Sequence, residues 1–444
     1  MRIPFGLSAH VRERGALAPV RLINMFAEQT SVTQDGTILQ SRLGLVADFT
    51  VGSGPIRASV VKDGVFDGDR MTVSGSEVYR GANLIGTLSG NGPVYIAMSD
   101  TEALFCAGED VYSYDGSTFA AVTMPYSEGT AALVHIDGLF MALRNGTGEW
   151  FFSAVLDGRD WDGTNFATAE SEADQLLDVV VLNGSLVFFG TETIEFWVKT
   201  GDASLPYTPV TQRVFKQGIK ATGCAVSEDN SFFWIGADNL FYRHDTVPKS
   251  VDDDALVEKI AASTSHRVFK VADGRHKLIC VRLDDSTYAY DVTTGAIAEF
   301  ATTGRSNFRA GPDMGDDETG TVWAFSGHLD NGEPLVREFT AGMELQQAAF
   351  LDNLRLVCEV GTTSDLEGEF ADPQIEVRHS RDYGRTWCNW LPASLGQQGD
   401  YDLRVEWRAL GLFRDPGAVF QFRVSAPVSF RVSAVAVNEP YGGR

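Results

Sequence analysis

The chain has 444 residues, of which 44% are hydrophobic and 22% charged, so it has enough apolar side chains for a substantial core. Its formal net charge of −24 at pH 7 argues against a protein that grips nucleic acid, because an acidic surface repels phosphate backbones. No run of about 18 apolar residues occurs, which excludes a membrane-spanning helix and predicts no membrane insertion.

Residues 1–50 have no repeat and are expected to form an extended N-terminal lead-in. The opening MRIPFGLSAHVRERGALAPV lacks a continuous apolar core and a cleavage site, so no secretory signal is expected. Four arginines stand against one glutamate in the first 25 residues: Arg2, Arg12, Arg14 and Arg21 against Glu13. A basic arm that docks on an acidic partner and a solvated, irregular start both remain open.

Short apolar alternations broken by Gly, Asp and Asn predict strands and tight turns over residues 51–345. Their turns lie roughly 33 to 48 residues apart, close to the length of a four-stranded propeller blade. The sequence therefore predicts a β-propeller of six or seven blades, an architecture that leaves few exposed strand edges. The expected hairpins lie at 71–80, 103–115, 139–153, 186–198, 232–243, 277–291 and 322–339.

Two further features complete the predicted fold, which is all-β. One helix is expected at SVDDDALVEKIAAS (250–263), where three aspartates fall in the first turn and apolar residues follow at helical spacing. After about residue 345 the rhythm changes to alternating strands with short turns. Residues 346–444 are expected to form a C-terminal β-sandwich.

Residue types that carry chemistry form no recognisable set. The seven histidines lack metal-ligand spacing, and neither a G-x-S-x-G elbow nor a P-loop occurs. The acidic DGRDWDG (157–163) does not match the EF-hand positions and is expected to be a surface turn. We expect no catalytic residue, no metal and no cofactor. The five cysteines lack a C-x-x-C pair and are expected to be buried reduced thiols: Cys106, Cys224, Cys280, Cys358 and Cys388.

The sharpest local motif is SRDYGRTW (380–387), which matches the Asp-box pattern S-x-D-x-G-x-T-W. We expect a structural hairpin lock, in which the aspartate caps backbone N–H groups, the glycine takes a positive φ and the tryptophan packs beneath. Asp-boxes are familiar from sialidases, where they lie away from the catalytic site. The matching residues are Ser380, Asp382, Gly384, Thr386 and Trp387.

The stretch NGSLVFFGTETIEFW (183–197), with TGD and then RVFKQGIKATGC (213–224), resembles the tail hub family of short-tailed bacteriophages, also called packaged DNA stabilisation proteins. LINMFAEQ (22–29), LVEKI (256–260) and the closing strands are similar to further family segments. FATAESEADQL (166–176) is similar to the family's A-E-x-x-P-D stretch, with Ala173 in place of proline. The structural signature positions are Gly190, Thr193, Ile194, Glu195, Phe196, Gly201, Gly218, Ile219 and Cys224.

The resemblance covers most of the chain in the same order and implies a non-enzymatic virion component. It implies a ring, commonly of six copies, that lies below the portal and adaptor proteins, extends the DNA channel and retains the packaged DNA. It also implies contacts with tail needle, fibre or spike proteins, and assembly in the host cytoplasm into the virion tail. Double-stranded DNA would pass through without sequence-specific binding.

Two other functions stay open on the sequence. A carbohydrate-active propeller, either a sialidase-like enzyme or a lectin, would need a central pocket that holds arginines and a carboxylate. A bacterial scaffold propeller unrelated to phage is the other. With 60 acidic residues in the chain, candidate carboxylate pairs occur throughout and do not discriminate.

Overall fold

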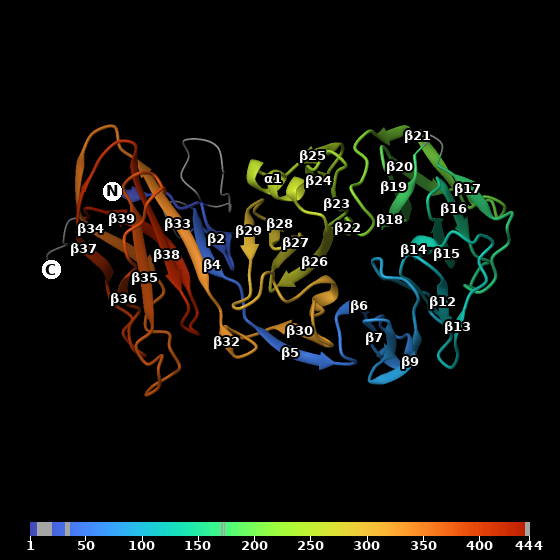
Figure 1. Ribbon diagram of the computed structural model, residues 1–444, viewed down its shortest axis with the longest axis horizontal. Coiled ribbons are helices and arrows are strands. Elements are labelled where there is room, and N and C mark those ends of the chain that lie inside the picture. The colour runs from blue at the N-terminus through green and yellow to red at the C-terminus, as the bar shows by residue number, and fades with distance from the viewer. Residues whose placement is uncertain (7–19, 32–35, 170–171, 173, 440–444) are drawn as a thin grey trace.

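The computed structural model describes residues 1–6, 20–31, 36–169, 172 and 174–439. Ala173, singled out above, lies outside the described residues. Figure 1 shows a ring of β-sheets and, beside it, a second β body built mainly from the C-terminal strands, with N-terminal strands between the two. A single α-helix, α1 (Asp254–Ala262), occurs in the described part of the chain, together with the short 3-10 helices η1 (Phe66–Gly68) and η2 (Pro312–Met314). The predicted all-β propeller with a C-terminal sandwich is confirmed.

Six blades of the propeller are four-stranded antiparallel units whose strands follow one another in the sequence. The first three are β6 (Ile56–Val60), β7 (Met71–Ser74), β8 (Glu77–Arg80) and β9 (Asn83–Thr87); β10 (Tyr95–Met98), β11 (Ala103–Cys106), β12 (Val111–Tyr114) and β13 (Phe119–Ala121); β14 (Thr130–Ile136), β15 (Leu139–Arg144), β16 (Glu149–Phe152) and β17 (Phe166–Thr168). The next three are β18 (Leu176–Leu182), β19 (Ser185–Gly190), β20 (Ile194–Lys199) and β21 (Tyr207–Phe215); β22 (Ala225–Glu228), β23 (Ser231–Ile235), β24 (Phe241–His244) and β25 (Pro248–Ser250); β26 (Arg267–Asp273), β27 (His276–Arg282), β28 (Thr287–Asp291) and β29 (Ile297–Phe300).

A seventh sheet closes the ring with a strand from the N-terminal segment. Its order is β30 (Thr321–Phe325), β5 (Leu45–Thr50), β31 (Leu329–Asp330) and β32 (Glu333–Pro334). The short helix η2 contacts both β26 and β6, so it lies between the sixth blade and the first. The strand β5 therefore brings the N-terminal segment into the sheet that closes the ring between the sixth blade and the first.

The first six expected hairpins are the two middle strands of the six blades, but the seventh expectation was wrong. Residues 322–339 do not form one hairpin of two long strands: they contain only the short hairpin of β31 and β32. Before it, β30 pairs with β5, and the later strand β33 (Arg337–Glu344) pairs with strands of the second body. The apolar alternation in this stretch is real. Its partners are supplied by distant segments, which a local pattern does not encode.

Both faces of a blade are buried, which explains why the strands are more apolar than simple alternation requires. In β20, Ile194 and Phe196 belong to the core shared with the fifth blade. Trp197, on the opposite face, belongs to the core shared with the third blade, where its ring meets the Trp150 ring edge-on at 5.2 Å between centroids. Each blade packs against two neighbours, so both of its faces are buried.

The second body is a sandwich of two sheets. One has the order β3 (Met25–Gln29), β4 (Thr37–Ser41), β39 (Arg431–Val437), β34 (Ala349–Cys358) and β37 (Val405–Phe413), and β1 (Arg2–Ile3) also pairs with β39. The other continues from the sixth blade through β2 (Leu22–Ile23) to β33, β38 (Gly417–Val424), β35 (Gln374–Ser380) and β36 (Leu391–Ser394). A nine-stranded sheet therefore runs from the propeller into the sandwich.

The described part of the first 50 residues, expected to be an extended lead-in, is extended and pairs with strands of both bodies. The strand β2 pairs with β29 of the propeller on one side and with β33 of the sandwich on the other. The hairpin of β3 and β4 joins the sandwich, and β5 joins the seventh sheet. The N-terminal segment therefore links the two bodies.

A buried ion pair fixes this segment at the junction. The Arg42 guanidinium and the Asp330 carboxylate are 0% and 1% exposed, and their two hydrogen bonds measure 2.9 and 2.6 Å. The remaining donors of Arg42 reach the Asn24 side chain and the backbone carbonyl groups of Leu43 and Ala301. All five guanidinium N–H donors therefore have a partner, which is the condition for burying this charge.

We predict that Arg42→Met lowers the free energy of unfolding by about 3–5 kcal/mol, because it leaves the Asp330 carboxylate buried without its counter-charge. Equilibrium denaturant unfolding of the whole chain measures the loss. The matched control is Lys62→Met, which breaks the exposed Lys62–Asp100 ion pair and should leave the unfolding midpoint nearly unchanged. Equal effects of the two substitutions would contradict a special role for the Arg42 pair.

Candidate functional site

Seven of the nine signature residues gather at the boundary between the fourth and fifth blades, and Glu195 lies on the other face of β20, where it accepts a hydrogen bond from Trp197. The turn between β19 and β20 is closed by the Gly190 N–H, which donates to the Thr193 carbonyl at 2.7 Å. The segment before β22 lies against this turn, because the Ile219 N–H donates to the Gly190 carbonyl at 2.9 Å. The ninth residue, Gly201, lies apart, in the loop between β20 and β21.

A carboxylate from a third motif completes this junction. Asp174 accepts hydrogen bonds from the Glu192 N–H at 2.9 Å, the Thr193 N–H at 2.8 Å and the Thr193 hydroxyl at 3.1 Å. It comes from the stretch 166–176, which precedes the fourth blade. Three of the motifs that carried the family resemblance therefore meet in space, although roughly 50 residues of sequence separate their ends.

The signature side chains next to the turn are buried. Ile194, Phe196, Ile219 and Cys224 share one apolar core with Phe232 and Trp234. Glu195, 2% exposed, accepts a hydrogen bond from the Trp197 indole at 3.0 Å. Burial raises the pKa of the Cys224 thiol to about 12, so this cysteine is an inert core residue. The arrangement is a joint between neighbouring blades, held by an apolar core and by the hydrogen bonds of Asp174.

We predict that Gly218→Ala lowers the free energy of unfolding by about 1–3 kcal/mol. An added Cβ would lie 2.1 Å from the Thr191 carbonyl oxygen, and that contact is with backbone that must move. The control is Gly342→Ala, where the nearest atom would be 3.7 Å away and nothing needs to shift. Thermal unfolding of both variants is the measurement, and equal midpoints would refute the close approach.

The Asp-box residues form one hydrogen-bonded turn after β35. The Ser380 hydroxyl donates to Asp382 at 2.7 Å and accepts from the Gly384 N–H at 2.7 Å. Asp382 also accepts from the Thr386 N–H at 2.8 Å and the Thr386 hydroxyl at 2.6 Å, and Gly384 has φ +95°. Trp387 is partly exposed, with the Arg378 guanidinium 4.8 Å from its ring centroid. The hydrogen bonds from Thr386, its hydroxyl first, hold the pKa of Asp382 down at about 2.

This low pKa predicts an acid-sensitive hairpin. Because the folded-state pKa is below the ordinary value, Asp382 contributes stability that is present above about pH 4 and is lost as the pH falls towards about 2. We expect the unfolding midpoint of Asp382→Asn to lie below that of the wild type at pH 7, and the gap to close near pH 2. The exposed Asp160→Asn is the control, for which no such closing gap is expected. A gap for Asp382→Asn that persists unchanged at pH 2 would contradict the assignment.

An axial cavity of about 400 Å³ lies between the innermost strands of the propeller, lined by residues of β10, β14, β18, β22 and β26. Asp178 on its wall accepts from the Tyr95 hydroxyl at 2.8 Å and from the Gly223 N–H at 2.9 Å, and burial raises the pKa of Asp178 to about 6. Sequence reasoning did not single out this residue. The available signal was one acid inside the otherwise apolar run LLDVVVL (176–182).

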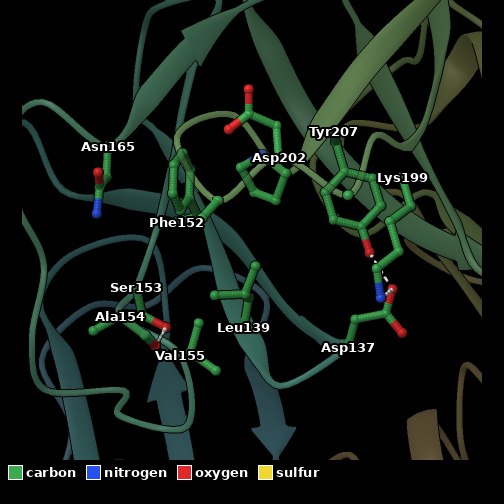
Figure 2. Close-up of a pocket in the computed structure, with 13 residues that line it drawn as sticks. Asp137, Leu139, Phe152, Ser153, Ala154, Val155, Asn165, Lys199, Asp202 and Tyr207 are labelled. Carbon is green, nitrogen blue, oxygen red and sulfur yellow. Dashed lines mark hydrogen bonds and ion pairs between the residues drawn. The ribbon is translucent and has the colours of Figure 1, made fainter.

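A second hollow, of about 270 Å³, lies between the third and fourth blades. Figure 2 shows its apolar side chains Leu139, Phe152 and Val155, with a polar cluster at one end. There Asp137 accepts from the Tyr207 hydroxyl at 2.9 Å and pairs with the Lys199 ammonium at 3.1 Å, and the Tyr207 bond, together with Lys199, lowers the pKa of Asp137. Gly201 contributes to the rim. The hollow is therefore apolar over most of its wall and carries the Asp137–Lys199 ion pair at one end.

Within the part of the chain that the structure describes, no group of three or more His, Cys, Asp or Glu side chains could hold a metal ion. Among the same residues, no helix is long and apolar enough to cross a membrane.

The fold and these sites define a class of protein: a β-propeller joined through shared strands to a β-sandwich, with hydrogen-bonded joints at its sequence motifs. Two family models match the chain, Bacteriophage P22 Gp10, beta-propeller, over residues 1–301, and Bacteriophage P22 Gp10, beta-sandwich, over residues 337–439. The chain belongs to the Bacteriophage P22 Gp10 family, and the resemblance to the tail hub family is confirmed.

Individual relatives are more distant. The chain is similar to the tail hub protein gp10 of Salmonella phage P22, with 23% identity over 301 residues. That alignment covers 61% of this chain and 62% of the phage P22 protein, so it spans less than two thirds of either. Among solved structures, the Cps50 (Swd1) β-propeller domain of Myceliophteria thermophila matches with 12% identity and a TM-score of 0.42, over 63% of this chain and 99% of that one. BamB from Moraxella catarrhalis matches with 12% identity and a TM-score of 0.34, over 68% and 94%.

Proposed function

We propose that this chain is a tail hub of a short-tailed bacteriophage, a non-enzymatic connector between the neck and the distal tail. The observation that carries the proposal is the match of two Gp10 family models, the β-propeller model over residues 1–301 and the β-sandwich model over residues 337–439. The relative from phage P22 is named a tail hub protein, and the same role is inferred here.

The way in which the propeller and the sandwich are joined supports a connector role. The sixth blade and the sandwich are parts of one nine-stranded sheet, and the buried Arg42–Asp330 pair holds the N-terminal segment at the same junction. A force applied to the sandwich would therefore reach the propeller through backbone hydrogen bonds in series rather than through a flexible linker. Such stiffness suits a subunit that bears load between two parts of a particle.

The charge supports a channel that DNA crosses without being held. With a formal net charge of −24, a ring of these chains would repel the phosphate backbone, so that packaged DNA is retained by closure of the channel and slides freely on release. The inferred partners are copies of this chain in a six-membered ring, the portal or adaptor protein above, and needle, fibre or spike proteins below. The inferred location is the virion tail, after assembly in the host cytoplasm.

The first test is the native mass of the purified chain, alone and mixed with the portal–adaptor complex of the same phage. Six copies of a 48.3 kDa chain weigh about 290 kDa, and we expect that species alone or bound to the neck complex. The control is a portal complex that lacks the adaptor. A chain that stays monomeric in every mixture and is absent from purified virions would refute the hub assignment, and turnover of glycans by that monomer would favour the carbohydrate-active alternative.

A further inference from the structure

Beside the Asp-box turn, a cysteine and a histidine face each other across the hairpin. The Cys388 N–H donates to the His379 carbonyl at 3.1 Å, which places the two residues opposite one another. The Cys388 sulfur lies 3.2 Å from Nδ1 of the His379 ring and accepts the His379 backbone N–H at 3.2 Å. The sulfur also lies 3.2 Å from the Asn389 carbonyl oxygen, so the thiol proton has two acceptors in reach, this carbonyl and the His379 ring nitrogen.

We propose that Cys388 and His379 form a reactive thiol–imidazole pair, a site of mixed-disulfide formation with small organic disulfides. This inference is independent of the proposed hub function, since it rests only on the hairpin geometry. It assigns the Asp-box a role beyond its own turn: the hydrogen bonds of Ser380 and Asp382 hold the hairpin in the register that keeps the sulfur against the ring.

The groups packed around the pair are cationic or aromatic. Arg378 on β35 and Arg381 in the turn are the nearby charged groups, and both are cationic. The strands packed against the ring contribute Phe413 from β37 and Phe420 from β38, at 5.3 and 6.4 Å between ring centroids. Burial, with the Arg381 charge, lowers the pKa of His379, so that the imidazole is neutral near pH 7 and can accept a proton.

The other four cysteines have a different environment. Burial raises the pKa of each of their thiols to about 12: Cys106, Cys224, Cys280 and Cys358. Cys358 is partly exposed like Cys388, but the neighbouring Glu359 charge further disfavours its thiolate. Of the two partly exposed thiols, Cys388 is the one that faces an imidazole, so reactivity should be confined to it.

The reaction balances without a further reagent. The Cys388 thiol transfers its proton to Nδ1 of His379, and the thiolate attacks one sulfur of the disulfide. A new S–S bond forms as the old one breaks, and the displaced sulfur leaves as a thiolate that takes the proton back. The protein thiol is oxidised to a mixed disulfide, and one half of the reagent is reduced to a thiol.

The test is the rate of reaction of the native full chain with an aryl disulfide that releases a coloured thiolate. We expect one fast equivalent, which is lost in Cys388→Ser and kept in the matched control Cys358→Ser. His379→Gln should slow the reaction about tenfold or more at pH 7. Near pH 9 the two rates should converge, because an ordinary thiol is then largely ionised. A purely structural effect of His379 would not depend on pH in this way.

A fast thiol that persists in Cys388→Ser, or equal rates for the wild type and His379→Gln at pH 7, would overturn the proposal. A second measurement does not require a variant to fold. The unmodified chain is incubated with oxidised glutathione under native conditions and its peptides are identified by mass spectrometry. A mixed disulfide confined to the Cys388 peptide supports the proposal, whereas absent labelling, or equal labelling of Cys358, contradicts it.

Discussion

The structure depends on one buried charge pair at the meeting point of its two bodies. Arg42 and Asp330 come from segments 288 residues apart, and the guanidinium also binds the Ala301 carbonyl and the Asn24 side chain. Removing two charges from water costs several kcal/mol each, and the pair is tolerated because every donor of the guanidinium has a partner. The geometry is satisfied only when the N-terminal segment, the end of the sixth blade and the seventh sheet are all in place. The pair therefore specifies how the two bodies are joined.

Local sequence patterns predicted the elements that are formed by residues close together in the sequence. The middle hairpins of six blades, the helix begun by Asp253 and the Asp-box turn each follow from residues close together in the sequence. The strands β2, β5 and β30 could not be placed in this way, because each pairs with a partner far along the chain. A two-residue strand such as β2 has no periodicity to detect. Its role follows only from the sheets on either side of it.

The same distinction between local and long-range contacts holds for the candidate sites. The signature residues were recognised from family resemblance. Their position side by side was not predicted, because it depends on Asp174, whose hydrogen bonds reach a turn 18 residues later in the sequence. Asp178 was overlooked because strand periodicity treats a lone acid in an apolar run as an irregularity. Cys388 was expected to be buried, yet it is partly exposed. Its contact with His379 depends on the hairpin register, which spacing alone does not reveal.

The sheet that closes the ring pairs strands that are synthesised at very different times. The closing strand β5 is made early, but its partner β30 is made more than 270 residues later, and β1 pairs with β39 near the other end of the described chain. The strands β1 and β5 therefore have no strand partner while the intervening blades are translated. Such long-range pairing raises contact order and slows folding, and it couples both bodies to the last strands made. A chain that stops before β30 could not close the propeller, and a chain that stops before β39 would leave β1 and β4 without the sandwich strand with which both pair.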